Sequence, residues 1–151
     1  MPDSSSTMYT WTPEGSVIIF LIKTPLHTLV YIPSKDMMYY AHPSFALSAK
    51  CATHSVFISQ SVMDKGDIPR LLVFDMARDG DRCLCETPSA ERYQILQERA
   101  GGSLQQPQCV VQWVGELSAM DKTFTASLPH NVKSFMSLTG NPLQRASVAS
   151  N

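Results

Sequence analysis

The chain has little net charge and no long hydrophobic run, and each absence excludes a class of function. Among its 151 residues, 12 Lys and Arg balance 13 Asp and Glu, for a net charge of -1. Strong nonspecific binding to polyanions is therefore not expected. The longest apolar run, Val17 to Ile22, is far shorter than the roughly 20 residues of a membrane-spanning helix, so we expect no membrane partner. Residues 1–12 contain no basic residue and no adjoining hydrophobic stretch, so no signal peptide is expected.

The cysteines and histidines lack the spacing of a metal or disulfide site. The cysteines lie at positions 51, 83, 85 and 109 and form neither a Cys-x-x-Cys pair nor a disulfide framework. Cys83 and Cys85 would share one face of a strand, and we interpret them as buried thiols rather than metal ligands. The histidines at 27, 42, 54 and 130 show no zinc-binding spacing. Reduced cysteines fit a cytoplasmic or nuclear protein.

Two signatures of catalysis are also missing. No Gly-x-Ser-x-Gly elbow surrounds Ser59 or Ser61, so serine hydrolysis has no support. Gly101-Gly102 has neither the lysine nor the following helix of a phosphate-binding loop. We therefore predict no catalytic residue and no metal ligand, and the residues identify no cofactor.

The apolar and polar residues that are present predict a series of short strands separated by turns. A flexible segment is expected over residues 1–14, a single domain over 15–140 and a flexible tail over 141–151. Strands are predicted at 16–23, 27–32, 37–41, 55–63, 70–76, 82–85 and 108–117. Asp79-Gly80 is expected to close a hairpin, because this pair accepts positive φ.

A helix is predicted after the second strand of this hairpin. Thr87 is a good N-cap and Pro88 a good first helical residue. The helix is expected to run to about Arg99, with Ala90, Tyr93 and Leu96 on its apolar stripe and Gly101-Gly102 at its end. A second short helix is expected over residues 131–138. The fold class is therefore α+β, a mostly antiparallel or mixed sheet with one or two short helices.

The segment from Leu71 to Leu96 carries a family resemblance. A buried strand ends in Phe74-Asp75, a hairpin follows, and the next helix carries Glu91-Arg92. This order resembles the central part of the covalent nucleotidyltransferase fold of ATP-dependent DNA ligases, RNA ligases and mRNA capping enzymes. A non-catalytic relative is the trimethylguanosine-cap-binding domain of snurportin. The resemblance covers at most residues 16–117.

The sequence departs from this family at its catalytic motifs. The family's Lys-x-Asp-Gly motif supplies the lysine that attacks the nucleotide; here Lys23 is followed by Thr24, Pro25 and Leu26. The family's Asp-Gly-Glu motif falls on the strand 57–62, which contains no acid, and the later motifs have no match. Nucleotidyl transfer needs an activated lysine and an oxygen-bound cation such as Mg²⁺. The resemblance therefore implies a binding-only member, although the sequence leaves catalysis open.

Four residues are candidates for ligand binding: Lys23, Tyr39, Asp75 and Arg92. Tyr39 and Tyr40 are adjacent on a predicted strand, so at least one is exposed and could stack on a base. Simpler interpretations stay open for each. Lys23 could be a solvated residue at a strand end, Asp75 could accept turn N–H groups, and Arg92 could pair with a nearby acid.

Two functions follow from these observations. The first is a non-catalytic nucleotidyltransferase-like domain that binds a nucleotide, an RNA end or a cap. The alternative is a small α+β module that binds another protein through an exposed strand edge or through its methionines, at positions 37, 38, 63 and 76. The sequence does not specify an oligomeric state.

Overall fold

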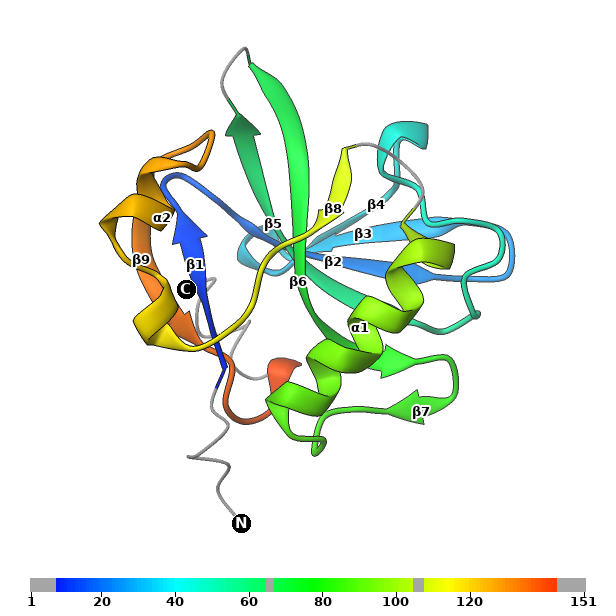
Figure 1. The fold of residues 1–151 in the computed structure, drawn as a ribbon. Coiled ribbons are helices and arrows are strands. Elements are labelled where there is room, and N and C mark those ends of the chain that lie inside the picture. Colours follow the sequence, from blue (N-terminus) through cyan, green and yellow to red (C-terminus); the bar gives the residue numbers. More distant parts are fainter. Residues whose placement is uncertain (1–7, 65–66, 105–107, 144–151) are drawn as a thin grey trace.

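The computed structural model describes residues 8–64, 67–104 and 108–143. Within these ranges the chain forms two β-sheets and two α-helices (Figure 1), which confirms the α+β class. The larger sheet has the order β4-β3-β2-β5-β6-β7, with β8 pairing to β6, and the smaller sheet contains β1 and β9. All pairs are antiparallel except β6 with β8. The strands are β1 Tyr9–Pro13, β2 Ile18–Lys23, β3 Thr28–Ile32, β4 Met37–Tyr40, β5 Val56–Asp64, β6 Ile68–Asp79, β7 Arg82–Cys83, β8 Cys109–Val111 and β9 Val132–Ser137.

Tight turns join most neighbours in the larger sheet. The turn between β6 and β7 contains Gly80 at φ 59°, as the Asp-Gly pair predicts. The main-chain N–H of Gly80 donates to the Ser55 hydroxyl at 2.9 Å, which ties this turn to the start of β5. Between β3 and β4, Asp36 is left-handed at φ 48°, and its carboxylate accepts a bond from the Tyr31 hydroxyl at 2.7 Å. Local turns therefore account for the pairings β2-β3, β3-β4, β5-β6 and β6-β7, whereas β5 pairs with β2 after a long connection from β4.

Helix α1 (Ser89–Ser103) covers one face of the larger sheet (Figure 1). Its Ile95 and Leu96 pack against Leu21, Val73 and other buried side chains of the first hydrophobic core. The predicted stripe is partly right, since Leu96 is buried and Tyr93 packs at the edge of the core. Gly101-Gly102 does not end the helix but lies in its last turn.

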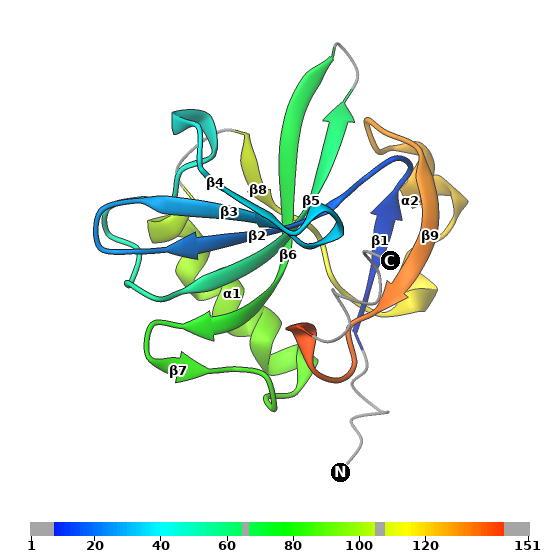
Figure 2. The same cartoon turned by 180° about the vertical axis from the view of Figure 1, so that it is seen from behind.

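A second core lies between the larger sheet and β9. Phe20, Ile58 and Phe74 of the larger sheet pack there with Leu138, which directly follows β9. A bulge in β6 shapes this side: Ile58 pairs with Asp75 and Ser59 with Val73, so Phe74 is the extra residue. Asp75 therefore lies on the same face of the larger sheet as Ile58, beside Phe74. Figure 2 shows from behind where the two sheets meet.

The structure corrects two predictions near the chain ends. Residues 132–137 form strand β9, not a helix, because they pair along β1, where Phe135 lies opposite Trp11. Sheet pairing has overridden a local pattern that fitted a short helix. For the same reason residues 9–13, expected to be flexible, form β1 and bury Trp11. Residues 1–7 and 144–151 of the two predicted flexible ends lie outside the described residues.

Two further differences are smaller. The predicted strand 108–117 is reduced to β8, and a short helix α2 (Lys122–Ala126) follows, capped by the Asp121 carboxylate that accepts from the Phe124 N–H at 2.9 Å. Among the described residues, no helix has both the length and the apolar character needed to cross a bilayer.

Candidate functional site

The structure places Lys23 and Tyr39 on the helix-covered face of the larger sheet. Lys23 pairs with Thr28, and Tyr39 pairs with Val30, two residues further along β3. Because side chains two residues apart share a face, Lys23 and Tyr39 lie on the same face on opposite sides of β3. Lys23 is only 8% exposed, whereas Tyr39 is exposed on the edge strand β4. Two of the four candidates therefore share a face of the sheet, with β3 between them.

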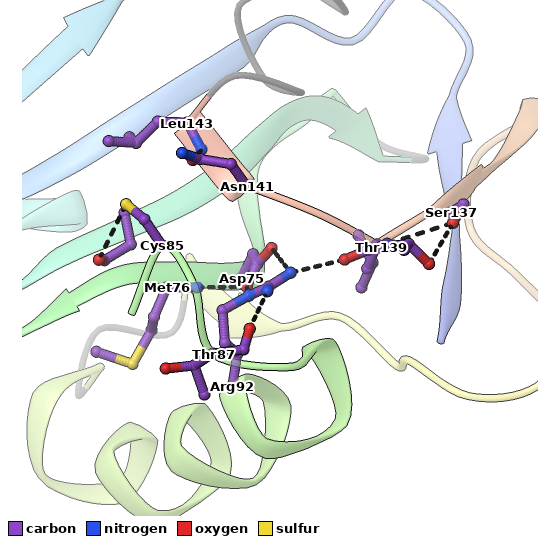
Figure 3. A network of polar contacts seen from close by, with 11 residues as sticks. Asp75, Met76, Cys85, Thr87, Arg92, Ser137, Thr139, Asn141 and Leu143 are labelled. Atoms are coloured by element: carbon purple, nitrogen blue, oxygen red, sulfur yellow. Dashed lines mark hydrogen bonds and ion pairs between the residues drawn. The ribbon is translucent and has the colours of Figure 1, made fainter. Parts of the chain in front are cut away.

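Asp75 and Arg92 come together as well, but as a buried ion pair (Figure 3). Arg92 Nε donates to Asp75 Oδ1 at 2.9 Å, and Nη2 donates to Oδ2 at 3.2 Å. Arg92 Nη1 also donates to the Thr87 carbonyl at 2.5 Å, and Nη2 donates to the Leu138 carbonyl at 2.6 Å. We call Asp75, Arg92 and these two carbonyls the Arg92 cluster.

The contacts of the Arg92 cluster are all with the protein's own groups. They engage four of the five N–H groups of a guanidinium, and Arg92 is 1% exposed. Asp75 Oδ1 also accepts the main-chain N–H of Met76 at 2.8 Å. The cluster joins β6, the start of α1 and the end of β9, so its observed role is to hold the two sheets and the helix together.

A second buried charge cluster lies at the opposite end of β5. The Asp64 carboxylate is 2.7 Å from Arg70 Nε and 2.9 Å from His130 Nδ1. The indole N–H of Trp11 donates to His130 Nε2 at 2.9 Å. Because the indole is a donor only, His130 Nε2 accepts, and the ring proton lies on Nδ1, which donates to Asp64. We call these four residues the His130 cluster.

The His130 cluster borders a polar cavity of about 350 Å³. The cavity is lined by Glu14, Met63, Asp64, Asp67, Pro129, His130 and Asn131. Among the described residues that line it, three are acids and none is Lys or Arg. A cavity with this electrostatic character repels phosphate groups, so we do not place a nucleotide there.

Between the two clusters, buried amides connect the sheets. Gln60 Nε2 donates to the Trp11 carbonyl at 3.0 Å and to Gln112 Oε1 at 3.2 Å. Gln112 Nε2 donates to the same carbonyl at 2.7 Å and to the Thr10 hydroxyl at 2.6 Å. Gln60 lies on the strand where the family resemblance would place the acids of Asp-Gly-Glu. This position therefore serves sheet packing.

An apolar cavity of about 390 Å³ opens on the face of the larger sheet that carries Lys23 and Tyr39. Its lining residues come mostly from β2, β3, β5 and β6: Gly15, Ile19, Val30, Phe45, Ser61, Val62, Met63, Pro69, Arg70 and Leu71. Val30 is the cross-strand partner of Tyr39, so Tyr39 lies on the same face next to a lining residue, although it is not itself among the lining residues. The volume is within the usual range for small-molecule sites, and Arg70 is the one basic residue among the lining. This cavity, with Tyr39 beside Val30, is the candidate ligand site.

The sequence alone missed the residues of the His130 cluster and of the apolar cavity. His130 contacts Trp11 across 119 positions of sequence and Asp64 across 66. No local spacing connects them, and the histidines looked scattered for this reason. Arg70 opens a predicted strand, but nothing in its neighbours shows that it lines a cavity.

Comparison with known proteins supports the fold. No protein-family model matches the sequence, and no curated protein matches it. The structure is similar to that of a mycobacterial DNA ligase D complexed with ATP and MES, at a TM-score of 0.65 and 14% sequence identity. The similarity covers 93% of this chain and 50% of the ligase chain, so this chain spans about half the ligase's length. The chain therefore has a fold similar to that of the matched part of this DNA ligase structure.

Proposed function

We propose that this chain is a non-catalytic nucleotidyltransferase-like domain that binds a nucleotide, an RNA end or a cap. The observation that carries the proposal is the similarity of 93% of the chain to a ligase solved with ATP. At 14% identity this similarity concerns the fold, so the ligand has to be argued from the residues of this chain.

The residues at the motif positions support binding without nucleotidyl transfer. Transfer needs a nucleophilic lysine and oxygen ligands for a divalent cation. Lys23 is buried at the end of β2, where its main-chain N–H donates to the Ser55 carbonyl at 2.9 Å, and no acid follows it in the turn. On the strand 57–62, which contains no acid, the Gln60 amide is engaged with Trp11 and Gln112. In the part of the chain that the structure describes, no three or more His, Cys, Asp or Glu residues form a metal-ligating group.

The apolar cavity and Tyr39 provide a place for a base. A ring entering the cavity would contact Ile19, Val30 and Leu71, while Tyr39, next to Val30, could stack on it. Stacking of a base on an aromatic side chain contributes about 1–3 kcal/mol. Arg70 is 31% exposed and already paired with Asp64, so it offers limited attraction to phosphate. We therefore expect affinity to come mainly from the base and to depend weakly on salt.

The test is a binding titration of ATP, GTP, methylated-cap analogues and short 5′-phosphorylated or capped RNAs, with and without Mg²⁺. A ligand at about 100 times its Kd stabilises the native state by about 2.7 kcal/mol, so a rise in Tm accompanies binding. Tyr39→Ala should weaken binding about fivefold to 150-fold, the equivalent of losing one stacked base. Tyr40→Ala is the matched control, because its side chain faces the other side of β4, near His27.

Two results would contradict the binding proposal. If none of these ligands raises the Tm at millimolar concentration, the binding proposal is wrong. Equal weakening by Tyr39→Ala and Tyr40→Ala would remove the apolar cavity as the site. Catalysis is tested separately with α-labelled ATP and GTP in Mg²⁺ or Mn²⁺: a covalent adduct that disappears in Lys23→Ala would make the chain an enzyme.

The alternative function, a protein-interaction module, is favoured by β4. All four of its side chains, Met37 to Tyr40, are exposed, and β4 ends the path of strands in the larger sheet. An exposed edge can accept an added strand. If this edge is the site, selection from a random-peptide library should return a common motif with the unmodified chain. A Met38→Pro variant should return none, because proline has no main-chain N–H to donate to an added strand.

We further propose a cytoplasmic or nuclear location. The proposal is supported by the cysteines, all four of which are free thiols. Imaging of the tagged full-length protein tests it, and a secretory or extracellular pattern would contradict it.

A further inference from the structure

Cys83 is the last residue of β7, and Cys85 lies two residues later in the short segment between β7 and α1. Cys83 is exposed at the end of β7, while Cys85 is partly buried two residues later. Two residues of extended chain span at most about 7 Å between Cα atoms, close to the range that a disulfide bridges. Cys85 Sγ also lies 3.9 Å from the Ala77 carbonyl, against β6. The pair therefore combines an accessible thiol with a second thiol held beside it.

The surroundings of Cys83 favour its thiolate. Arg78 is its direct cross-strand partner on β6, and the Arg78 guanidinium is held there by bonds to the carbonyls of Gly80 at 3.0 Å and Asp81 at 3.3 Å. The polar groups of Cys85, its main-chain N–H first and then its thiol, and the charge of Arg78 lower the pKa of Cys83. Burial, followed by the bond to Cys83, raises the pKa of Cys85.

We propose that Cys83 and Cys85 form an oxidation site, at which a hydroperoxide converts the dithiol into a Cys83–Cys85 disulfide. Cys83 is the accessible sulfur that meets the oxidant, and Cys85 is the neighbouring sulfur that completes the bridge. No other pair of cysteines has this arrangement: Cys51 and Cys109 are both buried, and burial raises the pKa of Cys109 to about 12.

The reaction balances in two steps. The Cys83 thiolate attacks one peroxide oxygen; an S–O bond forms, the O–O bond breaks, and the alkoxide or hydroxide that leaves takes a proton from water. The Cys85 sulfur then attacks the Cys83 sulfenic acid; an S–S bond forms, the S–O bond breaks, and water leaves with the Cys85 proton. The two thiols lose two electrons in total, and the peroxide gains them.

The site lies next to the Arg92 cluster. Figure 3 shows Cys85 beside Asp75 and Met76, on the segment that leads to Thr87. That segment is a tight turn, in which the Thr87 N–H donates to the Leu84 carbonyl at 3.1 Å, and the Thr87 carbonyl accepts from Arg92. A disulfide would therefore constrain the chain just before the first turn of α1.

The test measures thiol reactivity and peroxide products on the full chain. At pH 7, Cys83 should be alkylated faster than the same cysteine in the urea-unfolded chain, because the thiolate is the nucleophile and its pKa is lowered in the folded chain. One equivalent of hydrogen peroxide should remove two hydrogen atoms from the peptide that contains Cys83 and Cys85, and dithiothreitol should restore them. Cys51→Ser is the control and should leave both results unchanged.

Two variants separate the roles of the sulfurs. Cys85→Ser should stop at the Cys83 sulfenic acid, which a cyclic 1,3-diketone probe traps, and Cys83→Ser should form no disulfide. The proposal fails if Cys83 in the folded chain reacts no faster than in the unfolded chain. It also fails if peroxide carries Cys83 to the sulfinic or sulfonic acid while Cys85 stays alkylatable.

Discussion

The two buried charge clusters occupy opposite ends of the contact between the sheets, and they are built from different chemistry. In the Arg92 cluster a permanently charged guanidinium contacts a carboxylate and two carbonyls. In the His130 cluster the carboxylate of Asp64 contacts both Arg70 and a histidine, and that histidine accepts from Trp11. The first is surrounded by protein, whereas the second borders a polar cavity.

This difference determines how well each cluster tolerates the removal of one of its side chains. Removing one member of the Arg92 cluster leaves an opposite charge buried without its principal partner. Removing His130 leaves Asp64 paired with Arg70, beside a cavity that water can enter. Both ends hold the same two sheets together, but only the Arg92 end depends on a single ion pair.

The largest expected effect is that of Arg92→Met. This substitution leaves Asp75 buried and should lower the free energy of unfolding by about 3–5 kcal/mol, measured by urea denaturation. The double variant Arg92→Met with Asp75→Leu should recover part of the loss, because no buried charge then remains. A loss below about 1 kcal/mol for Arg92→Met would mean that the ion pair does not hold this end of the sheets.

The corresponding change at the other end should be smaller. His130→Phe keeps an aromatic ring near Trp11 but removes the bonds to Asp64 and the indole, so we expect a loss of about 1–3 kcal/mol. Urea denaturation under the conditions used for Arg92→Met provides the comparison. If His130→Phe costs more than Arg92→Met, the contrast between the two ends is wrong.

Alkaline pH gives a third comparison, between buried charge and a buried neutral thiol. Burial raises the pKa of Cys109 to about 12, so the folded chain keeps a proton that the unfolded chain loses above about pH 8.5. Rising pH therefore favours unfolding, by up to about 1.4 kcal/mol per pH unit from pH 8.5 until the folded pKa is reached. The stability of Cys109→Ala should fall less steeply between pH 8.5 and 10.5; parallel curves would contradict this assignment.

The smallest expected effect is that of a surface ion pair. Arg82 Nη2 lies 2.9 Å from Glu91 Oε2, with both side chains about half exposed. Arg82→Met should change the free energy of unfolding by about 0–1 kcal/mol, against 3–5 kcal/mol for the buried Arg92. Comparable losses for the two arginines would show that burial is not what separates them.

Much of the central fold could be predicted from local patterns, and the site could not. The strands from β2 to β6 follow from their apolar patterns and the Asp79-Gly80 turn, since each signal acts over a few residues. The start of α1 lies one residue later than predicted, with Pro88 rather than Thr87 as its N-cap and no side-chain cap. Strand β9 was mistaken for a helix because its structure depends on β1, more than 100 residues earlier. Of the four candidate residues, Lys23 and Tyr39 share a face and Asp75 contacts Arg92; their part in ligand binding stays a prediction.

By itself, the sequence determined the α+β class, the hairpin before α1, and the absence of acids from residues 24–26 and 57–62. These depend on residue identity and on interactions within one turn or one strand. The tertiary structure decided that Arg92 joins two sheets, that Asp64 and His130 meet beside Trp11, and that an apolar cavity opens near Tyr39. Such contacts connect residues whose sequence separation exceeds the range of any local signal, so they exist only once both sheets are assembled.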